Sequence, residues 1–98
     1  MVSSAKFPLG QVLATPGALE AMKESGQEAA FFLDRHSRCD WGQVCPDDAL
    51  LNDEALKDGG RIISAYCTLK GVKIWVITEA TDDNGQRAAT TILLPSEY

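Results

Sequence analysis

The densest set of chemically capable side chains lies in residues 34–40, which read Asp-Arg-His-Ser-Arg-Cys-Asp. Imidazole, guanidinium and carboxylate groups serve general acid-base and phosphate-handling sites, and this segment carries them at His36, Arg35, Arg38 and Asp40. The same residue types also suit a helix C-terminus, where Arg and His interact favourably with the helix dipole. His36 shares an apolar stripe with Phe32 and Leu33, which is the usual place of a packed histidine. Catalysis by these four residues is therefore our alternative hypothesis, and the preferred one assigns no catalytic residue.

The cysteines raise the question of a metal site. Thiolate and imidazole are ligands that zinc selects, and the chain offers Cys39, Cys45 and Cys67 beside His36. The sequence has no Cys-x-x-Cys pair, and Cys67 is expected to point into the core of a sheet. The spacing therefore predicts no metal site.

Charge and motifs narrow the classes of function. Fourteen acidic residues against nine basic ones give a net charge of -5, so the attraction that drives phosphate binding is missing and a nucleic-acid partner is disfavoured. Acidic side chains that could imitate nucleic-acid phosphates are more typical of a solvated helix face; they are Asp47, Asp48, Asp53, Glu54 and Asp58. The sequence lacks the common nucleotide-binding and hydrolase motifs. An enzyme is the minority hypothesis.

The length of the chain limits the number of domains, and its N-terminus, apolar runs and cysteines indicate the compartment. A chain of 98 residues has room for one domain with a two-layer core but not for a deep cofactor cavity, so we expect no cofactor. Residues 1–6 lack the basic and apolar regions of a signal peptide, and no apolar run reaches the ~18 residues of a membrane span. Three cysteines without a secretory signal indicate free thiols in a reducing compartment. We therefore expect a cytoplasmic protein that does not contact a membrane.

Three helices are expected in the first two thirds of the chain. Thr15 can cap a helix over residues 16–26, which begins with Pro and ends with Gly. Apolar residues at spacings of three and four indicate a second helix over residues 27–37. A third, over residues 46–59, starts with Pro followed by two acids. A short strand within residues 9–14 is also expected.

The last third of the chain changes to a period of two, with more β-branched and aromatic residues. This pattern predicts a three-stranded antiparallel meander over about residues 61–69, 72–80 and 88–94. Two-residue hairpin loops at Lys70-Gly71 and Asn84-Gly85 would set its register.

That register places large apolar side chains together on one face of the meander. Tyr66 lies opposite Trp75, Ile77 opposite Ile92, and Trp75 opposite Leu94. Three helices can cover one face of a small sheet, but covering both is harder in 98 residues. We therefore expect a protein-binding surface for an unknown protein or a second copy of the chain, formed by Tyr66, Trp75, Ile77, Ile92 and Leu94.

Distinctive segments occur along nearly the whole chain: Phe7-Pro8-Leu9-Gly10, Thr15-Pro16-Gly17, Asp40-Trp41-Gly42 and the final residues 90–98, Thr-Thr-Ile-Leu-Leu-Pro-Ser-Glu-Tyr. In these segments the chain resembles a family of short bacterial proteins labelled plasmid-related or hypothetical. The resemblance implies a mobile-element or accessory-genome setting rather than an activity. The chain departs from the family pattern at Cys39, where glycine is expected.

Taken together, the sequence predicts one α+β domain over residues 1–98, with three helices packed on a three-stranded antiparallel meander. The predicted function is that of a non-enzymatic, protein-binding accessory factor associated with plasmids or other mobile elements.

Overall fold

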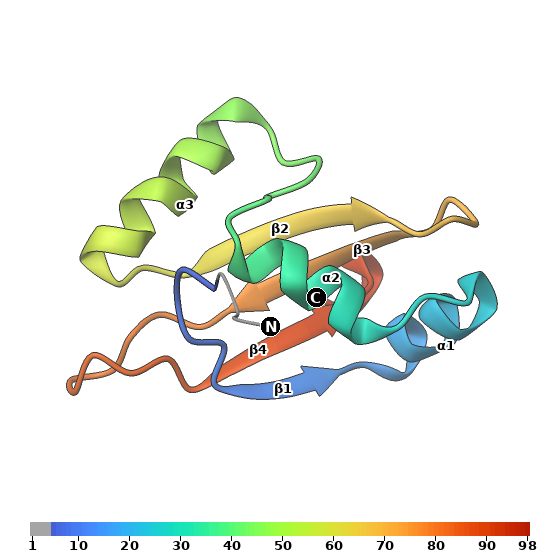
Figure 1. Cartoon of the computed structure of the whole chain (residues 1–98), viewed down its shortest axis with the longest axis horizontal. Coiled ribbons are helices and arrows are strands. Elements are labelled where there is room, and N and C mark those ends of the chain that lie inside the picture. Colours follow the sequence, from blue (N-terminus) through green and yellow to red (C-terminus); the bar gives the residue numbers. More distant parts are fainter. Residues whose placement is uncertain (1–4) are drawn as a thin grey trace.

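The computed structural model describes residues 5–98. The predicted absence of a signal peptide concerns residues 1–6, and most of that segment lies outside the described residues. In chain order the elements are β1 (Gln11–Ala14), α1 (Pro16–Ser25), α2 (Ala29–Ser37), α3 (Pro46–Asp58), β2 (Ile62–Cys67), β3 (Lys73–Thr78), β4 (Ala89–Leu93) and the 3-10 helix η1 (Pro95–Glu97) (Figure 1). The predicted α+β class and the three helices are confirmed.

The helix boundaries follow the local signals in the sequence. Thr15 caps α1 by accepting a hydrogen bond from the Ala18 amide, and Gly26 ends the helix in the left-handed conformation with φ 69°. Pro46 begins α3, and Gly59 ends it with φ 85°. Only glycine adopts such positive φ angles without steric cost, so these two positions stop their helices.

The sheet has four strands in the order β1-β4-β3-β2 and is mixed rather than purely antiparallel. The N-terminal strand β1 lies beside β4 and runs parallel to it, while β2, β3 and β4 form the expected antiparallel meander. The strand expected within residues 9–14 is confirmed as β1. The predicted three-stranded antiparallel sheet is wrong in strand number and in the direction of this added strand. A four-residue strand has no decisive period, and its partner lies more than seventy residues further along the chain.

The predicted strand register is off by one residue in both hairpins. Tyr66 pairs with Ile74 rather than with Trp75, and Ile92 pairs with Val76 rather than with Ile77. The cause lies in the loops, which have three residues between their closing pairs and not two.

In the first hairpin, the Thr68 amide donates to the Val72 carbonyl and the Thr68 hydroxyl accepts from the Val72 amide. In the second, the Asp82 amide donates to the Gln86 carbonyl. Each loop has a glycine with positive φ at its third position, as in three-residue hairpin loops with a bulge.

A one-residue slip sends every side chain to the opposite face of a strand, and this assigns the two faces of the sheet. The covered face carries Ile62, Ser64, Tyr66, Ile74, Val76, Thr78, Thr90 and Ile92. The open face carries Ile63, Ala65, Cys67, Lys73, Trp75, Ile77, Thr91 and Leu93.

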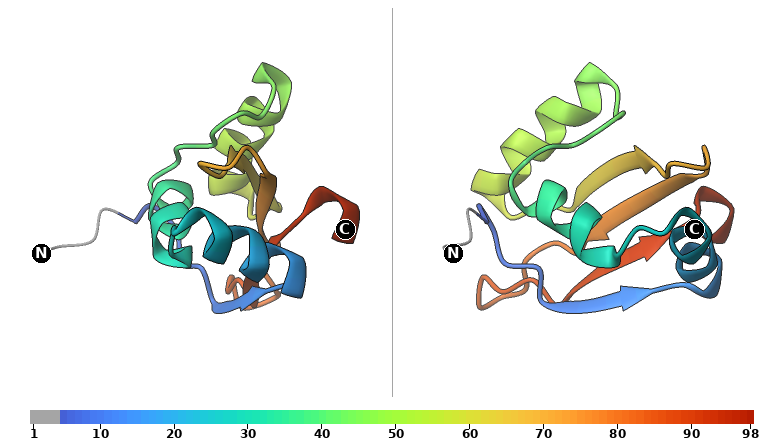
Figure 2. Two further views of the ribbon diagram at one scale, coloured as in Figure 1. Left: turned by 90° about the vertical axis from the view of Figure 1, so that its right-hand side faces the viewer. Right: turned by 45° about the vertical axis from the view of Figure 1, so that its right-hand side comes forward.

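Helices α1 and α2 pack on the covered face. Their side chains Ala18, Met22 and Phe32 form a buried cluster with strand residues that include Tyr66 and Ile92. The 3-10 helix η1 lies on the other side of the sheet from α2 (Figure 2). No helix of the α type lies across the open face within residues 5–98.

Helix α3 lies along the free edge of β2 and closes it. The Asn52 side chain accepts from the Ile63 amide and donates to the Ile63 carbonyl, as a neighbouring strand would. Ala65 makes two further backbone hydrogen bonds, with Trp41 and Gln43. These contacts satisfy a strand edge that would otherwise be open to pairing with another chain.

The distinctive segments of the sequence have structural roles. A side chain at Gly42 would overlap the Ala65 carbonyl oxygen, so the loop that approaches β2 needs glycine there. The Glu97 carboxylate accepts from the Thr15 hydroxyl and the Gly17 amide, and so ties η1 to the N-terminus of α1. Cys39 has φ 70°, a left-handed conformation that glycine adopts at lower steric cost than cysteine.

Candidate functional site

His36 is fully buried between α2 and the covered face of the sheet. Its Nδ1 lies 2.5 Å from Ser64 Oγ, and its Nε2 lies 2.9 Å from Thr78 Oγ1. The Thr78 hydroxyl lies 2.7 Å from that of Thr90, which donates to the Leu9 carbonyl at 2.7 Å. The imidazole is thus one member of a buried chain of hydrogen bonds across the sheet.

The end of this chain fixes the direction of its protons as far as the imidazole. Thr90 has one hydroxyl proton and gives it to Leu9, so it must accept from Thr78. Thr78 has then used its own proton and must accept from His36 Nε2. In the neutral imidazole, Nδ1 then accepts from Ser64. The network therefore assigns a proton to Nε2, which is the tautomer that a neutral imidazole adopts here.

The electrostatic surroundings favour a neutral imidazole. Burial, and to a lesser extent the positive charge of Arg87, lowers the pKa of His36 to about 4. Arg87 is itself 7% exposed, and its guanidinium donates to the carbonyls of Ala55, Gly60 and Glu79. Both ring nitrogens of His36 are hydrogen-bonded to hydroxyl groups and neither is bonded to a carboxylate. Within residues 5–98, no hydrogen-bonded negative charge therefore offsets the lowering of its pKa.

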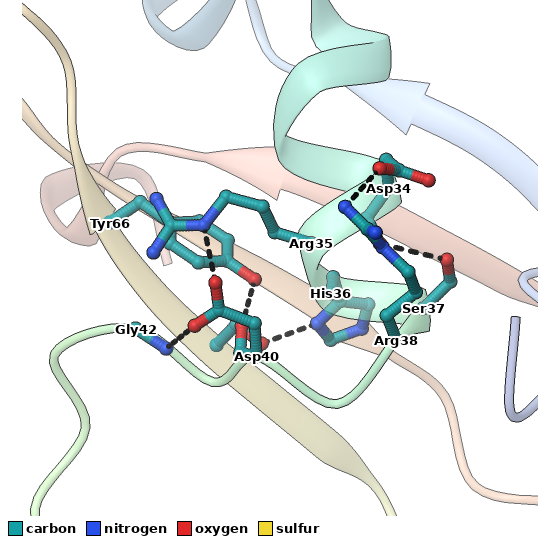
Figure 3. A network of polar contacts seen from close by, with 9 residues as sticks. Asp34, Arg35, His36, Ser37, Arg38, Asp40, Gly42 and Tyr66 are labelled. Atoms are coloured by element: carbon teal, nitrogen blue, oxygen red, sulfur yellow. Dashed lines mark hydrogen bonds and ion pairs between the residues drawn. The ribbon is translucent and has the colours of Figure 1, made fainter. Parts of the chain in front are cut away.

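The other members of the predicted cluster form pairs at the surface. Arg35 Nε donates to Asp40 at 2.7 Å, and its guanidinium lies 4.5 Å from the centre of the Tyr66 ring. Arg38 turns back along the helix to Asp34, at 2.5 Å. Figure 3 shows the two ion pairs on separate sides of α2, with the imidazole between them. The hydrogen bond from Arg35 holds the pKa of Asp40 below its usual range.

The structure therefore does not bring His36, Arg35, Arg38 and Asp40 together at an accessible point. A general base must reach the proton that it removes, and both ring nitrogens of His36 are already occupied inside the protein. The geometry gives no support to catalysis by this cluster.

The three cysteines also lie apart from the imidazole. Cys39 is partly buried, whereas Cys45 and Cys67 are exposed. Cys67 lies on the open face, with its thiol 3.4 Å from the Gln43 side-chain oxygen. The expectation that it points into the core was wrong because of the register. Among residues 5–98, no group of three or more His, Cys, Asp or Glu side chains is arranged to hold a metal ion.

The predicted protein-binding residues do not share one face. Tyr66 and Ile92 lie on the covered face and are 1% and 0% exposed, so they belong to the core. Trp75 and Ile77 lie on the open face; Trp75 is partly exposed there, whereas Ile77 is buried, at 4% exposed. Leu94 follows the end of β4 and packs against the core cluster as a partly buried side chain. The three-residue hairpin loops account for this division.

The open face has Trp75 at its centre. The indole is partly exposed, and the Tyr98 ring packs against it edge to face, with the ring centres 5.7 Å apart. Arg61 donates to the Tyr98 hydroxyl at 2.7 Å and so holds that ring in place. Between Trp75 and α3 there is a hollow of about 260 Å³ bounded by Ile63 and Lys73.

Two further hollows extend the open face on either side. One of about 370 Å³ lies between α3 and Ile63, and is lined by Leu51; this leucine is 61% exposed. The other, of about 220 Å³, lies between Ile77 and Tyr98. The three hollows are neighbours, because Ile63 borders the first two and Arg61 borders the second and the third.

The sequence analysis missed three contributors to this surface, namely Ile63, Leu51 and Tyr98. The hairpin sequence Thr68-Leu69-Lys70-Gly71 is compatible with a three-residue loop that has glycine at its third position, although a two-residue loop shares this glycine. The three-residue loop places Ile63 on the same face as Trp75. No comparable local signal brings Leu51 and Tyr98 to the sheet.

None of the helices within residues 5–98 has the length and apolar character needed to cross a membrane. No family model, curated protein or solved structure matches the chain. The functional argument therefore rests on the geometry of the open face.

Proposed function

We propose that this protein is a non-enzymatic protein-binding accessory factor and that it binds its partner through the open face of the sheet. The proposal is carried by one observation: α1 and α2 cover one face of the sheet, while the other presents a partly exposed Trp75 among apolar hollows. Aromatic anchors beside pockets supply much of the binding energy in protein interfaces.

The predicted surface is revised accordingly. Trp75 remains in it, and Ile63, Leu51 and Tyr98 join it. Ile77 lies on the same face but is buried, at 4% exposed, and supports the surface from beneath. Tyr66, Ile92 and Leu94 support it from the core. The association with plasmids or other mobile elements and the cytoplasmic location are part of the proposal; they derive from the sequence resemblance and from the free thiols.

The test is a binding measurement with Trp75→Ala. Partners captured from the native host are purified, and their affinity is measured for the wild type and the variant. We expect the substitution to abolish binding, or self-association if the partner is a second copy. It should cost well under the ~3–5 kcal/mol of unfolding free energy lost when a fully buried aromatic is truncated.

Phe31→Ala is the matched control, because Phe31 is an aromatic residue 51% exposed on α2. This variant should bind as the wild type does. A Trp75→Ala protein that is badly destabilised yet binds everything that the wild type binds would show that the open face is structural, and would remove the proposal.

A further inference from the structure

The charges around the open face are strongly biased towards one sign. Acidic side chains border the three hollows from α3, from the end of β3 and from η1; they are Asp48, Glu54, Asp58, Glu79 and Glu97. The basic side chains on the same borders are Arg61 and Lys73. The excess of negative charge surrounds apolar side chains, so this surface combines an apolar centre with an acidic rim.

Part of the basic charge on this rim already has a partner within the protein. Arg61 donates to the Tyr98 hydroxyl and stacks over the Tyr98 ring, 5.6 Å from its centre. By contrast, Asp48, Glu54 and Glu79 are exposed. Their carboxylates make no hydrogen bond or ion pair with the described residues 5–98. These carboxylates are free to meet charges on a partner.

This charge pattern discriminates between the possible occupants. A symmetric dimer through the same face would bring two acidic rims together, because an isologous interface places each patch against its own copy. Like charges held together across an interface are destabilising. A nucleic acid or an anionic membrane surface would meet the same repulsion. A segment with apolar side chains flanked by Lys or Arg complements both the centre and the rim.

We propose that the partner of the open face is a basic amphipathic segment of another protein, which inserts an apolar side chain beside Trp75 and places Lys or Arg against Asp48, Glu54 and Glu79. This inference rests on the proposed function and adds the chemistry of the partner. Complementary charge of this kind accelerates association and makes it sensitive to salt.

The experiment is a nuclear magnetic resonance titration of the whole 15N-labelled chain with three synthetic peptides. The first is an amphipathic leucine and lysine peptide. The second replaces lysine with glutamate, and the third replaces leucine with serine and so carries charge alone. We expect the first to shift the Trp75 indole N–H and the Ile63 amide. The second and third should bind at least about tenfold more weakly, a difference of about 1.4 kcal/mol.

Charge-reversal variants locate the interaction. Glu54→Lys combined with Glu79→Lys should weaken binding of the leucine and lysine peptide about tenfold or more. The matched control is Glu20→Lys combined with Glu24→Lys, which makes the same change in net charge on exposed positions of α1 and should leave binding near the wild-type value. If both double variants lose the same affinity for the peptide, the loss depends on net charge and not on the position of the carboxylates. That result would overturn the inference.

The outcomes separate this inference from the proposed function. If Trp75→Ala abolishes binding of the natural partner but neither charge nor salt alters it, the basic partner is wrong and the binding face stands. If the peptide shifts resonances on α1 or α2 instead of the Trp75 indole, the basic partner is also wrong. If, in addition, the natural partner binds Trp75→Ala as well as it binds the wild type, both proposals fail.

Discussion

The two faces of the sheet contain similar kinds of residues and differ in how those residues are satisfied. On the covered face His36, Ser64, Thr78 and Thr90 bond to one another and to the Leu9 carbonyl. No buried side-chain nitrogen or oxygen within residues 5–98 lacks a partner. On the open face Trp75 is only partly covered, by Tyr98. The comparison shows that the reactive residue types of the covered face satisfy one another within the fold, whereas the open face keeps an apolar surface that the described part of the chain does not fully cover.

The largest expected effect is on the free energy of unfolding, which should fall more when an aromatic side chain is removed from the covered face than from the open face. Tyr66→Ala should lower the free energy of unfolding by about 3–5 kcal/mol, since a fully buried aromatic leaves a cavity when it is truncated. Trp75→Ala should cost less than about 2 kcal/mol, because less apolar area returns to water. Urea denaturation of both variants measures the difference. Equal losses would mean that the two faces are equally part of the core.

The second prediction concerns pH and the buried imidazole. The unfolded chain binds a proton at His36 below pH 6.5, whereas the folded protein does so only below about pH 4. Between these values the unfolded state holds more protons, so stability falls as pH falls. The loss should approach about 3 kcal/mol by pH 4, at ~1.4 kcal/mol per pH unit.

His36→Gln removes the titrating group and serves as the comparison. Its free energy of unfolding should be lower than that of the wild type at pH 7. From pH 7 to pH 4 it should fall less steeply than that of the wild type. A wild-type protein whose stability does not change between pH 6.5 and 4 would show that the imidazole is reachable by solvent protons without cost.

The third prediction tests the loops that assign the faces. Gly71 and Gly85 have φ of 82° and 75° and no neighbouring atoms that a β-carbon would meet. Alanine at either position should therefore cost about 1 kcal/mol from backbone conformation alone. Thermal unfolding measures the loss, and cross-strand nuclear Overhauser effects should still pair Tyr66 with Ile74. Alanine variants as stable as the wild type would contradict the left-handed loop geometry.

The smallest effect is expected at the surface ion pair beside the imidazole. Removing both Asp34 and Arg38 by alanine substitution should change the unfolding free energy by less than about 0.5 kcal/mol, because exposed ion pairs contribute little. The measurement is a denaturation curve in low and high salt. A loss of several kcal/mol would mean that the surface cluster has a stabilising role that its exposure does not suggest.

Sequence reasoning was most successful where the deciding interactions are local. Thr15, Pro16 and Gly26 define α1 within the span of one helix, and the hydrogen bonds involved connect residues only a few positions apart. The same local argument identified the hairpins, but loops of two and of three residues share the same glycine signal. The choice between them moved Tyr66 from the predicted binding surface into the core.

Through its own local signals, the sequence determined three helices, a C-terminal antiparallel meander and a packed position for His36. Only the tertiary structure decided the parallel pairing of β1 with β4, the partners of His36 at Ser64 and Thr78, and the meeting of Tyr98 with Trp75. These contacts join residues that lie 23 to 78 positions apart. No local pattern fixes such pairs, because each depends on how whole elements pack and because a slip of one residue exchanges the two faces of a strand.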